Sequence, residues 1–367
     1  MSFFAGYAGY AGYAGYAGYA GYAGYAGYAG YAGYAGLASL TTAAENPMVA
    51  DALVRSRDAL FSPVSDPTKW KAEWVAPKKW GGDTASLPPL GAPAHFWTWD
   101  PHIRTALLDT ELLGLLDFQT PAGDALELKT RAAGGKALAK VKRPTRARFE
   151  EELALVQSWA TRREESATEI LSQMLPQLPF WASILQLNPN RHRHTLELLA
   201  TALRFTMVVV MRFKHVLACP RPSEYSPNIQ PMIPVPGYSA YPSGHATEAV
   251  VMERLLMSLT KQHAGSPLDT QLTRLTERIA QHRVTAGLHF PVDSQAGFAL
   301  GRALAGYLIA LGRATALNPG WKACDFDGGT GDDSGTNIGA DTTGSAPLLA
   351  LLWKKAEDEL ASDGFVA

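Results

Sequence analysis

Residues 240–245 read Ala-Tyr-Pro-Ser-Gly-His, and the rest of the chain is best understood outward from this stretch. Pro242 ends an extended approach, and Ser243 is a favoured N-cap for the apolar-periodic segment that follows. Gly244 leaves room for a backbone N–H to approach a ligand, and His245 places an imidazole in the first helical turn. Because the first N–H groups of a helix are unpaired, the stretch is consistent with an anion site. An ordinary helix start with a surface histidine is the alternative.

A second motif precedes this stretch. Lys214 is followed, after six residues, by Arg221 and Pro222. The apolar segment 205–217 must end at Pro220 and Pro222, because proline lacks the N–H that a helix needs. A separation of seven residues is about two helical turns, so both cations can face the same way. Taken alone, the motif is better explained by basic residues that complement the C-terminal end of a helix dipole.

A third motif follows, in which Arg283, His289 and Asp293 are separated by five and three residues. Pro291 is expected to break the chain after His289 and to begin the next helix, which places Asp293 close to the imidazole. A carboxylate bonded to one ring nitrogen fixes the tautomer and leaves the other nitrogen as nucleophile or ligand. A helical corner with a satisfied histidine is the simpler explanation of this motif by itself.

Together, the three motifs place three cations, a hydroxyl, a helix-start N–H and two histidines within residues 214–293. Such a set can surround a tetrahedral oxyanion and carry out chemistry on it. The sequence therefore predicts one site with two kinds of residue. The predicted oxyanion-binding residues are Lys214, Arg221, Ser243, Gly244 and Arg283, and the predicted catalytic residues are His245, His289, Asp293 and Lys214.

The three motifs resemble the signature of the type 2 phosphatidic acid phosphatases and vanadium-dependent haloperoxidases. That signature is Lys-x6-Arg-Pro, Pro-Ser-Gly-His and Arg-x5-His-x3-Asp, and all three parts are complete here in the same order. The resemblance extends over residues 195–317 and implies an all-α helical bundle. It implies that His289 is the phosphoryl acceptor of a phosphatase or the vanadium ligand of a haloperoxidase. It also implies that His245 is the general acid/base and that Asp293 orients His289. His282 stands where many members carry serine.

Two reactions share such a site, because vanadate and phosphate have similar charge and shape. Residues 239–247 (Ser-Ala-Tyr-Pro-Ser-Gly-His-Ala-Thr) are similar to haloperoxidase versions of the motif. We therefore expect a haloperoxidase-like enzyme with vanadate as cofactor, oxidising halide with hydrogen peroxide, with Lys214 polarising the peroxide. Tyr238 is a candidate for shaping a halide pocket, or simply packs. The short intervals between motifs are instead typical of compact acid phosphatases, which would hydrolyse a phosphomonoester through a phosphohistidine without a cofactor.

Helical periodicity dominates the chain after residue 95, and no segment shows convincing strand alternation. The sequence predicts an all-α catalytic domain over residues 95–325, a Gly/Asp-rich loop over 326–346 and a C-terminal helix within 347–367. The basic segment 123–142 has no clear assignment. The predicted helices of the domain span residues 101–118, 146–175, 195–217, 243–262, 267–288 and 291–317.

The N-terminal part has a different composition. Residues 5–36 are an uninterrupted Ala-Gly-Tyr repeat, too rich in glycine for a helix and without the proline of collagen. We predict a low-complexity tail over residues 1–36. It either has no function or serves assembly, including the formation of homo-oligomers. Residues 37–94 are predicted to form an irregular arm rich in Trp and Pro, with a short helix near 43–61. Its interleaved lysines and tryptophans suggest nucleic-acid stacking, but we expect the tryptophans to pack on the folded domain.

Net charge, cysteine count and hydropathy limit the kinds of partner and compartment that we expect. The 367 residues carry a formal net charge of −1, which argues against a nucleic-acid partner. Cys219 and Cys324 are too few for a disulfide framework and are expected to be reduced. The most apolar runs, 205–211 and 303–312, are shorter than the ~20 residues that a transmembrane segment needs. The N-terminus shows no secretory signal, so we expect a cytoplasmic protein.

Overall fold

The computed structural model describes residues 51–52, 55–56, 90–91, 93–121, 123–131, 135, 137–174, 177–313, 321–338 and 345–364. The predicted repeat tail (1–36) lies outside the described residues. So does nearly all of the predicted arm (37–94) with most of its expected helix. The chain divides into two units, Met1–Thr98 and Trp99–Ala367. The first contains the short helix α5 (Pro93–Thr98), and the second contains all three motifs.

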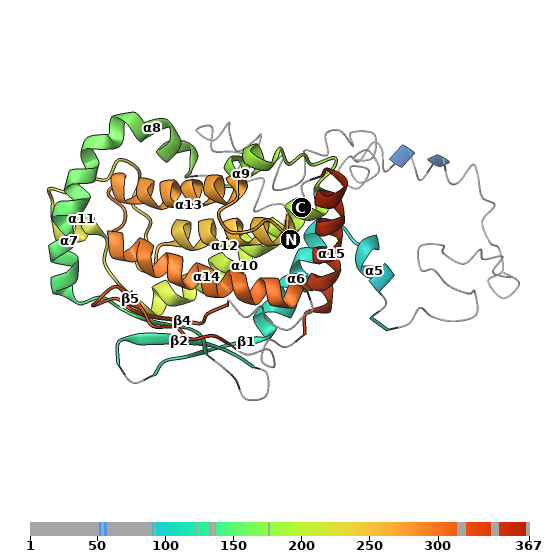
Figure 1. Ribbon diagram of the computed structural model, residues 1–367, viewed down its shortest axis with the longest axis horizontal. Helices are drawn as coiled ribbons and strands as arrows, with labels where there is room; N and C mark the ends of the chain where they lie inside the picture. Colours follow the sequence, from blue (N-terminus) through green and yellow to red (C-terminus); the bar gives the residue numbers. More distant parts are fainter. Residues whose placement is uncertain are drawn as a thin grey trace, which may run out of the picture. The chain divides into compact units, whose positions relative to one another are not determined.

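The second unit is mainly helical (Figure 1). The predicted helices 195–217, 243–262 and 267–288 are confirmed, with ends that differ by a few residues. The predicted helix 291–317 is confirmed over 291–313, and residues 314–317 lie outside the described residues. The predicted helix 146–175 is divided into α7, the 3-10 turn η6 and α8. The helices are α6 (Pro101–Gly114), α7 (Arg146–Trp159), η6 (Ala160–Arg162), α8 (Arg163–Ser172), α9 (Leu178–Leu185), α10 (Arg193–Leu217), α11 (Pro222–Tyr225), α12 (Gly244–Leu259), α13 (Pro267–Thr285), α14 (Pro291–Arg313) and α15 (Pro347–Ser362).

A five-stranded mixed sheet corrects the all-α prediction, which holds only for the helical part. Neighbouring strands are antiparallel except for β3 and β4, which are parallel. The predicted helix 101–118 therefore ends at Gly114, and the predicted loop 326–346 contains β5 and the end of β4. The strands, in sheet order, are β1 (Leu116–Gln119), β2 (Ala125–Thr130), β3 (Ala137–Lys142), β4 (Cys324–Asp327) and β5 (Asp332–Asp333).

The sheet escaped prediction because its strands are short and one of its strand pairs, β3 with β4, is long-range. β2 and β3 contain Lys or Glu between their buried residues, so their composition is that of a solvated segment. β3 pairs with its sequence neighbour β2 on one side and with β4, which lies far along the chain, on the other. An ion pair between Lys142 and Asp327 (2.9 Å) joins the ends of β3 and β4. Strand formation depends on such neighbours more than on intrinsic propensity, and a local pattern cannot reveal them.

The sheet also anchors the residues that precede α12. Tyr241 is fully buried, and its hydroxyl donates to the carbonyl oxygen of Lys142 at the end of β3 (2.8 Å). The sheet thus holds the segment that leads into the central motif.

Cys219 and Cys324 are both buried free thiols.

Close contact between α12 and α14 fixes the start of α12. These helices lie side by side with α13 (Figure 1). A Cβ atom added at Gly297 would lie 2.7 Å from the carbonyl oxygen of Ser243, and one at Gly301 would lie 2.7 Å from that of Thr247. Only glycine allows the two backbones to approach so closely. The amide of Ser243 donates to the carbonyl oxygen of Asp293 (2.9 Å), which joins the first turns of the two helices directly.

Within the described residues, no helix combines the length and the apolar character that crossing a membrane requires.

Candidate functional site

The central motif forms the beginning of α12. Ser243 is the N-cap, as predicted, and its fully buried hydroxyl accepts from the amide of Ala246 (3.4 Å). Gly244 and His245 follow in the first turn, where backbone N–H groups have no partner inside the helix. A Cβ atom at Gly244 would come no closer than 3.8 Å to another residue. A side chain at this position would therefore meet only ordinary van der Waals contact with Val210.

Lys214 and Arg221 meet at the same backbone segment, but not by the predicted route along one helix. Helix α10 ends at Leu217, and Ala218 turns the chain with a positive φ of 48°. Arg221 lies beyond this turn as the N-cap of α11. Both cations donate to the carbonyl oxygen of Ser239, from Nζ of Lys214 at 2.9 Å and from Nη2 of Arg221 at 3.3 Å. Lys214 also donates to the carbonyl oxygen of Ala240, and each cation is only 2% exposed.

The third motif adopts the predicted geometry. Nδ1 of His289 lies 2.9 Å from Oδ2 of Asp293, and the same oxygen accepts from the amide of Phe290 (3.0 Å). Nε2 of His289 lies 3.1 Å from Nη1 of Arg221. A guanidinium group can only donate, so Nε2 accepts and Nδ1 carries the proton given to Asp293. The Nε2 lone pair of His289 therefore accepts from a cation of the predicted site.

Arg283 and His245 both contact the end of α8. Nη2 of Arg283 donates to the carbonyl oxygen of Ile170 (3.1 Å) and to Oε1 of Gln173 (3.3 Å). Nε2 of His245 lies 2.9 Å from the carbonyl oxygen of Gln173. His282 contacts Oε1 of Gln173 through Nδ1 (2.9 Å). One residue upstream of all three motifs thus touches both Arg283 and His245.

Comparison with known families places the predicted site residues within one matched segment. Residues 195–315 match the family model of the PAP2 superfamily. This segment is a PAP2 superfamily domain. The match begins in the first turn of α10, ends just beyond α14 and includes every predicted site residue. No curated protein matches the chain significantly. Membership supports an enzyme of phosphatase or haloperoxidase type.

Burial lowers the pKa values of the three cations of the PAP2 site. It lowers the pKa of Lys214 to about 7, helped by the nearby positive charge of Arg221. It also lowers the pKa of Arg221, and that of Arg283 to about 10. Burial raises the pKa of Asp293 to about 7, although the backbone bond from Phe290 opposes this. A bound dianion would favour the charged form of each cation, because it supplies the missing opposite charge.

Both histidines of the PAP2 site are neutral near pH 7. Burial and the charge of Arg283 lower the pKa of His245 to about 3. The pKa of His289 lies well below its ordinary value, because burial and the charges of Arg221 and Lys214 disfavour an imidazolium ion. A neutral His289 is the form that can act as a nucleophile or as a ligand.

Glu248 is a site residue that sequence reasoning missed. It lies three residues after His245 on α12 and therefore on the same face of the helix. Oε2 of Glu248 accepts from Nε2 of Gln177 (3.4 Å), which also donates to the carbonyl oxygen of His245 (3.3 Å). Burial raises the pKa of Glu248 to about 7, and the charge of Lys214 opposes the shift. The i, i+3 spacing from His245 could have identified Glu248 from the sequence.

Tyr238 lies at the exposed edge of the PAP2 site. Its ring centroid is 5.6 Å from Nζ of Lys214 and 5.4 Å from Cζ of Arg221, and the residue is 48% exposed. Its carbonyl oxygen accepts from Nε (3.2 Å) and Nη2 (3.0 Å) of Arg221. The negative face of the ring therefore lies over the two cations, between them and solvent.

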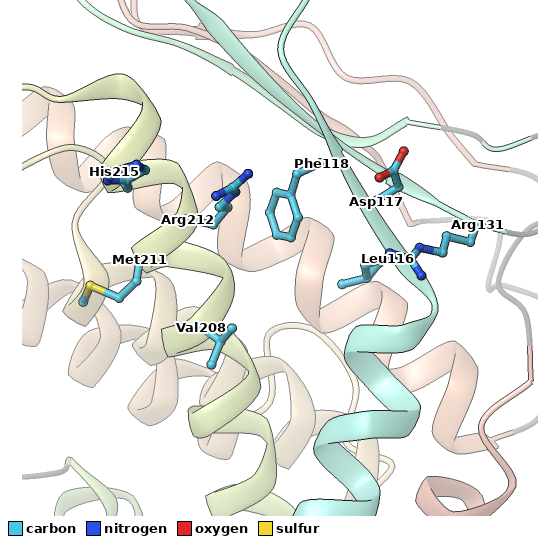
Figure 2. Close-up of a pocket in the computed structure, with 8 residues that line it drawn as sticks. All are labelled: Leu116, Asp117, Phe118, Arg131, Val208, Met211, Arg212 and His215. Carbon is cyan, nitrogen blue, oxygen red and sulfur yellow. The ribbon is translucent and has the colours of Figure 1, made fainter.

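A separate surface pocket of about 500 Å³ lies between α10 and β1 (Figure 2). Phe118, Arg212 and His215 are among the residues that line it. None of the predicted PAP2 site residues, all of which the structure describes, contributes to this lining. The pocket is therefore distinct from the anion site.

Proposed function

We propose that this protein is a haloperoxidase-like enzyme that oxidises halide with hydrogen peroxide, using vanadate bound to His289. The observation that carries the proposal is the state of His245. Its Nε2 gives its proton to the carbonyl oxygen of Gln173, so Nδ1 is left as a neutral proton acceptor. Attack by peroxide begins with loss of a proton, which such a group can accept. The similarity of residues 239–247 to haloperoxidase sequences supports the same conclusion.

The residues present fit a vanadate ion. Nε of Arg283 is buried and has no hydrogen-bond partner among the described residues, so a donor is available for an oxyanion. Lys214 and Arg221 would neutralise further negative charge, and the hydroxyl of Ser243 and the amide of Gly244 would add neutral donors. Vanadate, when bound, activates peroxide towards halide without a change in its own oxidation state.

The protein groups divide the remaining work. Asp293 holds the proton of Nδ1 and so keeps Nε2 of His289 available as the ligand atom. His245 accepts the proton of hydrogen peroxide at Nδ1. Lys214, once charged, polarises the peroxide, and the surrounding burial excludes water. Halide would enter past Tyr238, at the exposed edge beside the two cations.

A phosphomonoesterase is the second candidate, and Glu248 favours it. A carboxylate beside Lys214 would repel halide when ionised. In its protonated form it could supply the proton that His245 needs before it can protonate a leaving alkoxide. Nε2 of His289 would attack phosphorus as the bond to the alkoxide breaks, and water would then hydrolyse the phosphohistidine. This reaction requires no cofactor.

An assembly role for the repeat tail, which lies outside the described residues, stays a prediction. Deletion of residues 2–36, followed by measurement of oligomer size in solution, tests it. An unchanged oligomer size would remove the tail from any account of assembly.

Parallel assays separate the two reactions. The purified protein, with and without added vanadate, is tested for peroxide-dependent halogenation and for hydrolysis of an aryl phosphate. We expect halogenation only with vanadate, and vanadate inhibition of any hydrolysis. Hydrolysis without halogenation at saturating vanadate would overturn the haloperoxidase proposal in favour of the phosphatase.

The same assays test the assignment of His245. The variant His245→Ala should lose activity in whichever assay the wild type is active. His215→Ala is the matched control, because His215 is exposed on α10 and lines the separate pocket. Full activity of His245→Ala would remove His245 from the mechanism.

A further inference from the structure

Gln173, at the C-terminal end of α8, is fully buried against the anion site. It precedes the matched PAP2 segment and belongs to none of the three motifs. Three side chains from α12 and α13 contact it. His245 contacts its carbonyl oxygen, while His282 and Arg283 contact its side-chain oxygen.

These contacts fix the orientation of the Gln173 amide. The atom facing Nη2 of Arg283 must be an acceptor, because a guanidinium group has no lone pair to offer. A reversed amide would place two donors 3.3 Å apart in a buried setting. Oε1 therefore faces Arg283, and His282 donates to the same oxygen from Nδ1 (2.9 Å). The NH₂ group of Gln173 is directed away from this contact.

The NH₂ group of Gln173 has no acceptor in the described part of the protein. The same is true of Nε of Arg283, whose guanidinium group touches the Gln173 amide. Each group is almost completely buried, with Gln173 0% and Arg283 1% exposed. Burial of a donor without an acceptor is unfavourable, so two such donors on residues that contact each other require an explanation. A shared anionic acceptor provides one.

We propose that Gln173 is a further oxyanion-binding residue, whose side-chain NH₂ donates to the bound anion beside Nε of Arg283. The proposal rests on the oxyanion-binding function proposed above and holds for vanadate and for a phosphoryl group alike. Gln173 thereby joins three parts of the site: it binds the anion, it holds Arg283 through Oε1, and its carbonyl oxygen sets the tautomer of His245. A neutral donor in this position adds a hydrogen bond to the anion without adding charge.

Two substitutions at Gln173 test the proposal. Gln173→Glu keeps the shape and the acceptor that Arg283 and His282 require, but places an oxygen where the NH₂ group was. Gln173→Met keeps the approximate length and removes both polar atoms. We expect phosphate and vanadate to bind roughly tenfold more weakly to Gln173→Met. For Gln173→Glu we expect a loss of about a hundredfold or more, since a carboxylate then faces the anion.

Affinity is measured by calorimetry on the full chain with inorganic phosphate and with vanadate separately, and the Tm of each variant is measured without anion. A purely structural role predicts that affinity falls only as Tm falls, with the isosteric Gln173→Glu the milder change. Our proposal predicts the reverse order for affinity. Equal anion affinity of Gln173→Glu and wild type would overturn it.

Arg278→Ala is the matched control. Arg278 joins α13 to α8 through a two-bonded ion pair with Glu169 (2.7 and 2.5 Å) but contacts neither unpartnered donor. We expect its anion affinity to stay within about twofold of wild type. Anion binding by the wild type distinguishes failure of the proposed function from failure of the role of Gln173. If it binds neither phosphate nor vanadate, the proposed function fails, whereas binding that Gln173→Glu leaves intact refutes only the role of Gln173.

Discussion

The proposed anion site has two walls that are held in different ways. On one wall, Lys214 and Arg221 donate to backbone carbonyls of residues 238–240, and His289 is oriented by Asp293 four residues later. On the other wall, Arg283 and His245 depend on Ile170 and Gln173 at the end of α8. The first wall is supported by residues within the PAP2 segment, and the second by residues that precede it.

The two walls contain different parts of the proposed reaction and are supported from different parts of the chain. The first wall contains the atom proposed to bind vanadium or phosphorus, and its supports lie a few residues from the groups that they hold. The second wall needs a helix from outside the matched segment to fix the proton acceptor and one anion-binding cation. Changes to the first wall should therefore remove the reaction, while changes to the supports of the second should alter anion binding.

The largest effect is expected at His289. His289→Ala removes Nε2, the proposed nucleophile or ligand, and should reduce turnover by a factor of at least about 10³ in either assay. His215→Ala serves again as the control, and circular dichroism checks that both variants fold. Turnover of His289→Ala within tenfold of wild type would mean that the first wall does not contain the reacting atom.

The junction of the two walls is expected to be sensitive to volume. Gly297→Ala places a Cβ atom 2.7 Å from the carbonyl oxygen of Ser243, at the point where α14 meets the start of α12. Overpacking of this kind costs ~1–3 kcal/mol, which corresponds to a loss of several degrees in Tm. Gly114→Ala is the control, because nothing lies within 4 Å of a Cβ atom there. An equal Tm for the two variants would show that the junction can relax.

Glu248 is expected to make the free energy of unfolding depend on pH. Its pKa is raised to about 7 in the folded protein, from an ordinary value of 4.5, by burial, with Lys214 acting in the opposite direction. The folded state therefore binds the proton more tightly, and ionisation of Glu248 destabilises it progressively as pH rises from about 5 to above 7. Gln177 donates to Glu248, and Lys214 and Tyr238 interact with it electrostatically.

Glu248→Gln removes this ionisation. At pH 5 its Tm should equal that of the wild type, and at pH 8 the variant should be more stable by about 1–3 kcal/mol. Thermal melts at both pH values measure the difference. A constant Tm difference between pH 5 and pH 8 would show that Glu248 does not titrate in this range, and would remove it from the phosphatase candidate.

The two walls also differ in how far the sequence could predict them. Prolines 220, 222 and 291 mark chain breaks, and the spacing of His289 and Asp293 within one turn specifies their contact, so the first wall could be anticipated residue by residue. Even there, Lys214 and Arg221 meet through the turn at Ala218 and not along one helix. Gln173 was not predictable, because it lies 110 residues before Arg283 and only packing joins them. The pairing of β3 with the distant strand β4 was hidden for the same reason, whereas β1, β2 and β3 pair with sequence neighbours and were missed because they are short and contain charged residues.

The smallest expected effect gives the sharpest test of the second wall. Arg278 and Glu169 form a bidentate ion pair between α13 and α8, with side chains 52% and 34% exposed. Exposed pairs contribute at most about 1 kcal/mol, so Arg278→Ala should lower Tm by no more than a few degrees at low salt and less at high salt. Melts at 0.02 and 0.5 M NaCl measure this difference. A loss as large as that of Gly297→Ala would mean that this ion pair, and not the buried contacts of Gln173, holds α8 against the site.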